Sequence, residues 1–302
     1  MTVVIQTEKL TKAYGPHRGI VDLDLEVADG EVFGFLGPNG AGKTTTIRTL
    51  LDHLRPTSGR ARVLGIETTA DPVELHRRTG YLPGEFTLYD RLTGGQTIEF
   101  FGNLRGGVDP AYRASLVERL DLDPSRRFKE YSKGNKQKVG LVVALQHRPE
   151  LLILDEPTSG LDPLVQQAFY GLVGEAQAEG RTVFLSSHVL SEVERTCDRV
   201  AIVRDGRLVR TGRVDTLRDL AHHQVELRFA EPVPAAEFTA LPGVSDVEVE
   251  DHTLRLRLAG PMTPVVQAAA RHELLDFLSS EPSLEATFLA EYGRQATEVP
   301  SR

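Results

Sequence analysis

The pattern of hydrophobic and polar positions along this chain predicts two parts, a large α/β part and a smaller α+β part. Four consecutive apolar residues, Leu151 to Leu154, predict a strand buried on both faces at 151–155, and further strands are predicted at 31–36, 78–82 and 182–187. Helical periodicity predicts helices at 43–51, 94–104, 110–120 and 134–145. Buried strands that alternate with helices are typical of an α/β domain with a parallel sheet.

Strict alternation marks the segments that flank this core. Residues 21–27 alternate between apolar and acidic side chains, and with the turn Ala28-Asp29-Gly30 and the run at 31–36 they predict a hairpin, whose antiparallel strands should flank the parallel core. Beyond about residue 220 the pattern predicts strands at 224–230, 244–250 and 253–258, a helix at 264–270 and a further strand at 273–278. These four strands, with the helix at 264–270 and a second helix for which no bounds are predicted, indicate a small α+β ferredoxin-like domain over 220–294.

Candidate chemistry begins where the first buried strand ends. A glycine-rich segment joins this strand to the next helix and reads Gly37-Pro38-Asn39-Gly40-Ala41-Gly42-Lys43-Thr44-Thr45. In such a turn, successive backbone N–H groups point at the positive end of the helix, where a phosphate can bind. Lys43 is then expected to reach the β- and γ-phosphates, and the Thr44 hydroxyl to ligate Mg²⁺. The segment therefore predicts a phosphate loop for a nucleoside triphosphate.

A second buried strand ends in two carboxylates. Asp155 closes the apolar run that starts at Leu151, and it is placed to hold Mg²⁺ through water. Glu156 follows on the opposite side of the pleat, where it is expected to accept the proton of an attacking water. Either carboxylate alone is more often an ordinary charge at a strand end, so it is the phosphate loop upstream that favours a catalytic pair.

From Val3 to about Arg213, the chain resembles the nucleotide-binding subunit of an ATP-binding cassette (ABC) transporter. The motifs that carry this resemblance, besides the phosphate loop and the carboxylate pair, are Tyr14, Tyr131-Ser132-Lys133-Gly134-Asn135-Lys136-Gln137, Ser159-Gly160-Leu161-Asp162 and His188. Taken singly, each has an ordinary interpretation as a half-buried aromatic, a helix cap or a surface residue. Their joint order along the chain is what indicates the family.

The resemblance implies a role for each motif. Tyr14 would stack on adenine, and His188 would contact the γ-phosphate and help to position the water. Ser132, Lys133 and Gly134 would contact the γ-phosphate bound to the opposite subunit of a dimer, and Asp162 would belong to a loop that crosses the dimer interface and contacts the nucleotide site. These expectations apply only if two cassettes associate head to tail.

Two segments depart from the usual family pattern. After the strand at 78–82, where most members carry a glutamine near Mg²⁺ and the water, this chain reads Pro83-Gly84-Glu85. The γ-phosphate sensor is then absent, shifted to Glu85, or replaced by water. Lys133 and Asn135 stand where Gly and Gln are commoner. Because the phosphate loop, the carboxylate pair and His188 are intact, we still expect ATP hydrolysis.

Composition narrows the class of partner and the location. A formal net charge of −8 and a pI near 5.7 argue against nucleic acid as a partner. The single cysteine, Cys197, excludes an internal disulfide. The longest apolar runs are too short to cross a bilayer, so a transporter of this type requires a separate polytopic permease. The expected location is cytoplasmic, on the inner face of the cell membrane.

Two further segments bear on the partner. By resemblance, the region at about 85–104 grips the permease, and its apolar residues are Phe86, Leu88, Tyr89, Leu92, Phe100 and Phe101. An equally open interpretation is that they form local core. Residues 281–289 resemble the C-terminal helix of ATPases of type-2 ABC exporters, which include drug and antibiotic efflux systems, and the tail at 295–302 is expected to be flexible.

The sequence thus predicts an α/β phosphate-loop ATPase of the ABC cassette type at 1–219, with a mixed sheet and a helical subdomain at about 85–150. Its expected function is that of an ATP- and Mg²⁺-dependent motor, a homodimer that powers export through the permease. Two alternatives stay open at this point. One is a soluble ABC-type regulator that acts on ribosomes or DNA, and the other is a module that senses ATP with little hydrolysis.

Overall fold

The computed structural model describes residues 2–15, 17–85, 89–219 and 223–280. Contacts within the chain divide it into two compact units, Met1–Gly212 and Arg213–Arg302. The division falls before helix α8 (Val214–Asp219), so this helix belongs with the C-terminal unit, whereas the sequence predicted a boundary just after it.

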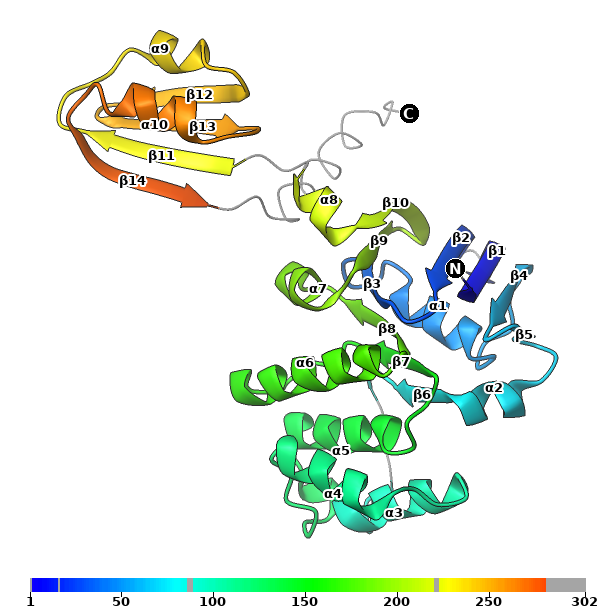
Figure 1. The fold of residues 1–302 in the computed structure, drawn as a ribbon. Helices are drawn as coiled ribbons and strands as arrows, with labels where there is room; N and C mark the ends of the chain where they lie inside the picture. Colours follow the sequence, from blue (N-terminus) through cyan, green and yellow to red (C-terminus); the bar gives the residue numbers. More distant parts are fainter. Residues whose placement is uncertain (1, 16, 86–88, 220–222, 281–302) are drawn as a thin grey trace. The chain divides into compact units, whose positions relative to one another are not determined.

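The centre of the first unit is a six-stranded sheet in the order β10-β9-β3-β8-β7-β6 (Figure 1). Its strands are β3 (Val32–Leu36), β6 (Thr79–Leu82), β7 (Leu151–Asp155), β8 (Thr182–Ser187), β9 (Arg199–Arg204) and β10 (Arg207–Arg213). The five strands from β9 to β6 are parallel. Every residue of β3, β7 and β8 is buried, which explains apolar runs such as Leu151 to Leu154. The four predicted strands are confirmed.

A second sheet of the same unit is antiparallel and has the order β2-β1-β4-β5. Its strands are β1 (Val3–Tyr14), β2 (His17–Ala28), β4 (Ser58–Val63) and β5 (Ile66–Glu67). The predicted hairpin between 21–27 and 31–36 is wrong, because β2 pairs with β1 while β3 lies between β8 and β9 in the other sheet. The reason is burial: β2 buries only alternate residues, such as Leu23 and Leu25, which suits a sheet with one exposed face, whereas β3 is buried on both faces, which suits the centre of the covered parallel sheet.

Helices cover the six-stranded sheet and form a separate subdomain beside it. Those that connect sheet strands are α1 (Lys43–Leu50), α2 (Pro72–Arg78), α6 (Pro163–Ala178) and α7 (Leu190–Thr196). The subdomain contains α3 (Gly94–Leu104), α4 (Pro110–Arg119), the 3₁₀ helix η1 (Phe128–Glu130) and α5 (Lys133–Leu145), and Figure 1 shows α3, α4 and α5 side by side. The start of α3 is fixed by a capping box between Thr93 and Gln96. The four predicted helices are confirmed to within one residue at each end.

Three aromatic residues of the region at 85–104 form a cluster at the surface, which we call the aromatic cluster: Tyr89, Phe100 and Phe101. The rings of Tyr89 and Phe100 lie 5.8 Å apart, and those of Phe100 and Phe101 5.5 Å apart, both edge to face. Tyr89 is 59% exposed and Phe100 is 40% exposed, so the interpretation as local core is wrong for these two. Leu92 is partly buried, and Phe86 and Leu88 lie outside the described residues.

His147, two residues after α5, is expected to make stability depend on pH. Burial, and then the nearby Arg105, lower the pKa of His147 to about 4. As pH falls below about 6.5, the unfolded chain binds this proton before the folded protein does, so the free energy of unfolding falls between pH 6.5 and 4 and is unaffected above that window. The expected loss is about 1–2 kcal/mol by pH 5. Urea unfolding at pH 7 and pH 5 should show that the free energy of unfolding falls more in wild type than in His147→Gln. Equal decreases in the two proteins would contradict the lowered pKa of His147.

Besides α8, the described residues of the C-terminal unit form one antiparallel sheet in the order β12-β13-β11-β14 and two further helices. Its elements are β11 (His223–Phe229), α9 (Ala235–Thr239), β12 (Val244–Glu250), β13 (Thr253–Leu258), α10 (Thr263–Ala269) and β14 (Leu274–Ser280). The predicted four strands and two helices are therefore present, in the order expected of a ferredoxin-like domain. The predicted helix at 281–289 and the tail at 295–302 lie outside the described residues.

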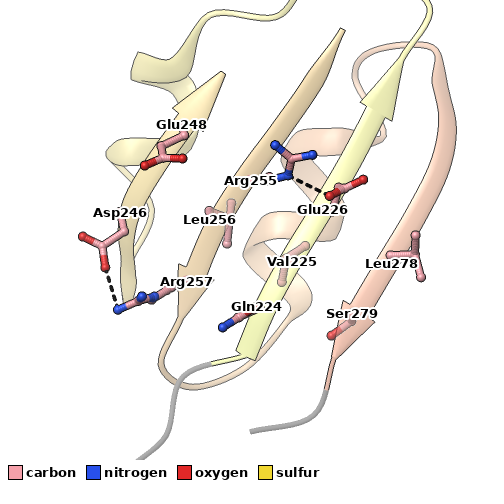
Figure 2. Close-up of a pocket in the computed structure, with 10 residues that line it drawn as sticks. All are labelled: Gln224, Val225, Glu226, Asp246, Glu248, Arg255, Leu256, Arg257, Leu278 and Ser279. Carbon is pink, nitrogen blue, oxygen red and sulfur yellow. Dashed lines mark hydrogen bonds and ion pairs between the residues drawn. The ribbon is translucent and has the colours of Figure 1, made fainter. Parts of the chain in front are cut away.

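One face of this sheet is a core and the other carries charges. Leu227 and Leu254 pack with Phe238 and Val265 of the helices. Figure 2 shows the opposite face, where Arg255 pairs with Glu226 at 2.8 Å and Arg257 pairs with Asp246 at 3.2 Å around a hollow of about 450 Å³. These ion pairs are exposed, and such pairs contribute little to stability. The face therefore has the character of a solvated antiparallel sheet surface.

Candidate functional site

The parallel strands bring the residues singled out in the sequence to one edge of the six-stranded sheet. The carboxyl ends of parallel strands meet at the same edge, and this is where ligands bind in open α/β sheets. The phosphate loop follows β3, Gly84 follows β6, Glu156 follows β7 and His188 follows β8. Four separate segments of the chain thus converge on one place.

The phosphate loop is held in shape by its own lysine. Lys43 is 6% exposed, and its Nζ donates to the carbonyl oxygens of Gly37 at 2.7 Å and Pro38 at 3.2 Å. Gly42 has φ of 103°, and a Cβ there would lie 2.6 Å from the carbonyl oxygen of Gly19. Only glycine fits this position, because both the dihedral angle and the space exclude a side chain. The loop is preformed for binding an anion.

Asp155 presents oxygen atoms of the kind that Mg²⁺ prefers. It is 1% exposed, and its Oδ2 accepts a hydrogen bond from the Thr44 hydroxyl at 2.8 Å while its Oδ1 accepts one from Ser186 at 2.5 Å. Mg²⁺ in nucleotide sites is held by one or two protein oxygens together with phosphates and water. The adjacent oxygens of Thr44 and Asp155 fit this requirement.

Glu156 connects the lysine of the loop to the histidine after β8. Its Oε1 lies 3.1 Å from Lys43 Nζ, and its Oε2 lies 2.7 Å from His188 Nδ1. The residue does not continue the pleat of β7 as expected, because its φ is 51°, in the left-handed region. This conformation costs roughly 1 kcal/mol for a residue with a Cβ, and strained residues of this type concentrate at functional sites. It turns the carboxylate toward both partners.

Two hollows meet at Thr44 and Glu156. The first, of about 260 Å³, is lined by residues that include Tyr14, Gly19, Asn39, Gly40 and Thr45. The second, of about 360 Å³, is lined by residues that include Arg48, Gly84, Glu85, Lys133 and His188. The sequence analysis missed Gly19 and Arg48. Gly19, just before the alternating segment at 21–27, is the one glycine of β2, and this was a usable signal, since a glycine within a strand often marks a close approach.

Tyr14 lies at the mouth of the first hollow with its ring available for contact. It is 45% exposed, and its Cε2 would be 2.8 Å from a Cβ on Gly19. Lys12 Nζ lies 5.6 Å from the ring centroid. An exposed aromatic ring beside a phosphate loop is suited to stacking on a base.

The predicted signature loop opens helix α5 and contacts the loop that follows Glu156. Ser132 is the N-cap of α5 and accepts a hydrogen bond from the Asn135 N–H at 3.3 Å. Gln137, which is 2% exposed, donates from Nε2 to the carbonyl oxygens of Glu156 and Pro157, both at 3.1 Å. This amide therefore connects the helical subdomain to the catalytic strand, a contact that the sequence analysis missed.

Asp162 acts as a helix cap in the structure. Its Oδ1 accepts hydrogen bonds from the N–H groups of Leu164 at 3.1 Å and Val165 at 3.0 Å at the start of α6. The hydrogen bond from Val165 is the main cause that lowers the pKa of this carboxyl group. A role of Asp162 at the nucleotide stays a prediction.

Replacing Gly134 with alanine is expected to damage both stability and turnover. A Cβ at Gly134 would lie 2.3 Å from the carbonyl oxygen of Gly160, so the loop at 159–162 has to move. Overpacking of this kind costs about 1–3 kcal/mol, and a shift of about 1 Å near a catalytic group can cost roughly 10²-fold in rate. Gly174→Ala is the matched control, because its added Cβ meets no atom within 4 Å and should stabilise helix α6 slightly. Equal melting temperatures and kcat values in the two variants would contradict the argument.

Gly84, which stands where the sequence analysis expected a glutamine, lies beside Asp155. A Cβ on Gly84 would lie 3.3 Å from Asp155 Oδ2, so a side chain at this position would contact the carboxylate that is predicted to hold Mg²⁺. Glu85 is exposed and lines the same hollow as His188. The transfer of the sensor function to Glu85 stays a prediction.

Comparisons with known proteins agree with this geometry. Residues 20–159 match the ABC transporter family. The chain is 35% identical to the bacitracin transport ATP-binding protein of Enterococcus faecalis over 85% of its own length and 84% of that protein. It belongs to the ABC transporter family. A second relative, the daunorubicin/doxorubicin resistance ATP-binding protein of Streptomyces peucetius, is 34% identical over 98% of this chain and 94% of its own length.

A solved structure described as the ATP-binding subunit of an ABC transporter has the same fold as the ABC cassette of this chain. It is 31% identical, covers 71% of this chain and 92% of its own length, and superposes with a TM-score of 0.66. The chain is therefore an ATP-binding subunit of the ABC family, and its activity is ATP hydrolysis. Among the described residues, no helix is both long enough and apolar enough to span a membrane.

Proposed function

We propose that the chain is the motor subunit of an ABC exporter, which dimerises on ATP and drives export through a separate membrane permease. The observation that carries the proposal is the Glu156 carboxylate, which lies 3.1 Å from Lys43 Nζ and 2.7 Å from His188 Nδ1. Hydrolysis of a γ-phosphate requires a base, a cation on the phosphates and a group that holds the water at one place. These three side chains supply that combination.

Each residue of the nucleotide site has its own role in this proposal. Tyr14 stacks on adenine, and the main-chain N–H groups of the loop from Gly37 to Thr45 bind the phosphates. Thr44 and Asp155 hold Mg²⁺, which neutralises charge on the β- and γ-phosphates when it is bound. Glu156 accepts the proton of the attacking water, and His188 orients the Glu156 carboxylate and the water. The Glu156–Lys43 ion pair supports this assignment, since it places the base beside the phosphate-binding cation.

The site is completed by a second copy of the chain in a head-to-tail homodimer. Ser132, Lys133 and Gly134 of the partner subunit contact the γ-phosphate across the interface, and the loop that ends at Asp162 crosses it. ATP then favours the closed dimer because it bridges the two copies, and loss of the γ-phosphate removes those bridging contacts. Lys133 adds a positive charge near the triphosphate, which favours binding electrostatically.

The permease binds at the aromatic cluster. Exposed aromatic residues grouped at one place on the surface are typical of protein interaction sites, and Tyr89, before α3, and Phe100, on α3, are both exposed. The subunit is then peripheral, on the cytoplasmic face of the membrane. The net charge of −8 agrees with the absence of a nucleic-acid partner.

The cargo belongs to the class of antibiotics and similar drugs. The two relatives described above carry names that refer to bacitracin transport and to daunorubicin and doxorubicin resistance. Similarity to both over most of their length supports an efflux role for this chain. Cargo selection resides in the permease, since the ATPase contacts only nucleotide and permease.

Purification of the tagged chain from native membranes in mild detergent, with ATP and Mg²⁺, tests the proposal. Mass spectrometry should identify one polytopic membrane protein in stoichiometric amount, and the complex should hydrolyse ATP. Phe100→Ser should lose this partner while still binding ATP, whereas the control Val73→Ser, at a residue 78% exposed on α2, should retain it. Recovery with ribosomes or nucleic acid, and without a membrane protein, would overturn the transporter assignment.

A further inference from the structure

We propose that Glu192, on helix α7, is a positioning residue that fixes the segments of Glu156 and His188 relative to each other during ATP hydrolysis. The inference rests on the catalytic roles proposed above for those two residues. Glu192 belongs to neither the phosphate loop nor any of the motifs that identify the family. Its importance follows from what its carboxylate contacts.

Helix α7 gives Glu192 a rigid support. The helix packs on strand β3 at Gly34, where a Cβ would lie 2.8 Å from Val193 Cγ1 and 3.0 Å from Cys197 Sγ. Val193 and Cys197 are both buried. Because the helix and the strand approach so closely, the backbone of Glu192 is held against the strand that leads into the phosphate loop.

The two carboxylate oxygens of Glu192 bind two different segments. Its Oε1 accepts a hydrogen bond from the Thr158 hydroxyl, and its Oε2 accepts one from the Ser187 hydroxyl at 2.7 Å. Thr158 is 5% exposed and Ser187 is fully buried. Hydrogen bonds from hydroxyl groups to an ionised carboxylate are about twice as strong as neutral ones, and burial protects these from competition by water.

These two segments carry the catalytic pair. Thr158 lies two residues after Glu156, and its carbonyl oxygen accepts a hydrogen bond from Leu161 N–H at 3.0 Å in the loop that follows. Ser187 directly precedes His188, and its carbonyl oxygen accepts from Gly37 N–H at 3.2 Å at the start of the phosphate loop. One carboxylate therefore connects the base, the histidine and the loop.

A loss of this connection should affect the chemical step more than nucleotide binding. The bond between Glu156 and His188, at 2.7 Å, depends on the relative position of the two segments. A displacement of about 1 Å in such an arrangement can cost roughly 10²-fold in rate. Most residues that line the first hollow lie on β1, β2, the loop after β3 and α1, and among the described residues none of them hydrogen-bonds to the Glu192 carboxylate, whose partners are Thr158 and Ser187.

The test compares steady-state ATP hydrolysis by the full-length wild type and its variants, in complex with the permease. Glu192→Ala is expected to lower kcat by about tenfold or more, with the KM for ATP unchanged within about twofold. Glu192→Gln can still accept one hydrogen bond, so its kcat should fall less than that of Glu192→Ala. This variant also keeps the test possible if Glu192→Ala does not fold. Thr158→Val should also lower kcat, and the double variant Thr158→Val/Glu192→Ala should be no slower than Glu192→Ala alone, because both remove the same bond.

Thr196→Val is the matched control. The Thr196 hydroxyl donates to the main-chain oxygen of Glu192 at 2.6 Å, so this variant removes a hydroxyl from the same helix without touching the carboxylate. Its kcat should stay at the wild-type value. A normal kcat in Glu192→Ala, or losses in kcat that multiply in the double variant, would overturn the inference. Glu156→Gln is measured in parallel to test the proposed catalytic site separately. If Glu156→Gln keeps its turnover, the proposed catalytic site is wrong; if it loses turnover while Glu192→Ala does not, only the role of Glu192 is wrong.

Discussion

Glu156→Gln is expected to lower the kcat for ATP hydrolysis by about 10²- to 10⁴-fold, which is the contribution typical of a general base. Glutamine has nearly the same shape as glutamate but cannot accept the proton of the attacking water. The backbone conformation, with φ of 51°, and the hydrogen bond to His188 need not change, because the amide oxygen can accept from the imidazole. The loss should therefore be catalytic rather than structural.

The same substitution should strengthen ATP binding and stabilise the dimer. Lys43 forms an ion pair with Glu156 at 3.1 Å in addition to its bonds to the loop carbonyls. Removing the negative charge of Glu156 removes repulsion toward the γ-phosphate and leaves Lys43 free to bind it. Because the variant binds ATP and does not hydrolyse it, the bridged dimer should accumulate.

Two measurements check this expectation. Phosphate release gives kcat, and size-exclusion chromatography with light scattering gives the oligomeric state with and without ATP and Mg²⁺. Glu118→Gln makes the same change at an exposed carboxylate on α4 and should leave both unchanged. An oligomeric state that is the same with and without ATP in Glu156→Gln would contradict the dimer mechanism, and a normal kcat would contradict the role of Glu156 as base.

The features of the fold that the sequence predicted are those that depend on short segments. The loop from Gly37 to Thr44 combines unusual dihedral angles with a strand before it and a helix after it, so its position is readable from local chemistry alone. The run from Leu151 to Leu154 is apolar on both faces, as is typical of a parallel sheet covered on both faces. Once such strands are parallel, their carboxyl ends meet, and the convergence of Asp155, Glu156 and His188 follows from topology.

What the sequence did not reveal depends on contacts between distant segments. The partner of β3 is β8, about 150 residues further along the chain, and alternation in β2 gave no sign that the two neighbours in sequence lie in different sheets. Gln137 and Glu192 both support the site through hydrogen bonds to residues more than 15 positions away. A buried polar side chain of this kind has no local signature, because its partner is fixed only when the sheet has formed.

Lys43→Ala is expected to weaken binding of ATP by about 10- to 100-fold, with a much smaller effect on AMP. A charge-assisted hydrogen bond to phosphate contributes about 1.5–3 kcal/mol, which corresponds to this range at about 1.4 kcal/mol for each factor of ten. The effect should be specific for the β- and γ-phosphates, since a loop lysine of this kind reaches that end of the nucleotide. Adenine stacking on Tyr14 does not involve Lys43 and should persist.

Lys43 also supports the shape of the phosphate loop, and losing this support adds to the loss of ATP affinity. Its Nζ bonds to Gly37 and Pro38 keep the two carbonyl oxygens together, so the alanine variant leaves both without this donor and leaves Glu156 without its cation. Phosphate must then approach a loop that has lost its internal support and a carboxylate that has lost its neutralising charge. The affinity for ATP should therefore fall more than loss of the phosphate contact alone requires.

Titration calorimetry with ATP and AMP, each with Mg²⁺, measures this difference directly. Lys129→Ala removes the same charge from an exposed position on η1 and should leave both affinities unchanged. Combining the two substitutions tests whether the ATP-bridged dimer requires Lys43. Glu156→Gln should form a dimer with ATP, whereas Lys43→Ala/Glu156→Gln should stay monomeric at the same ATP concentration. A double variant that still dimerises would show that ATP can bridge the two copies without Lys43, and the phosphate role assigned to this residue would then be wrong.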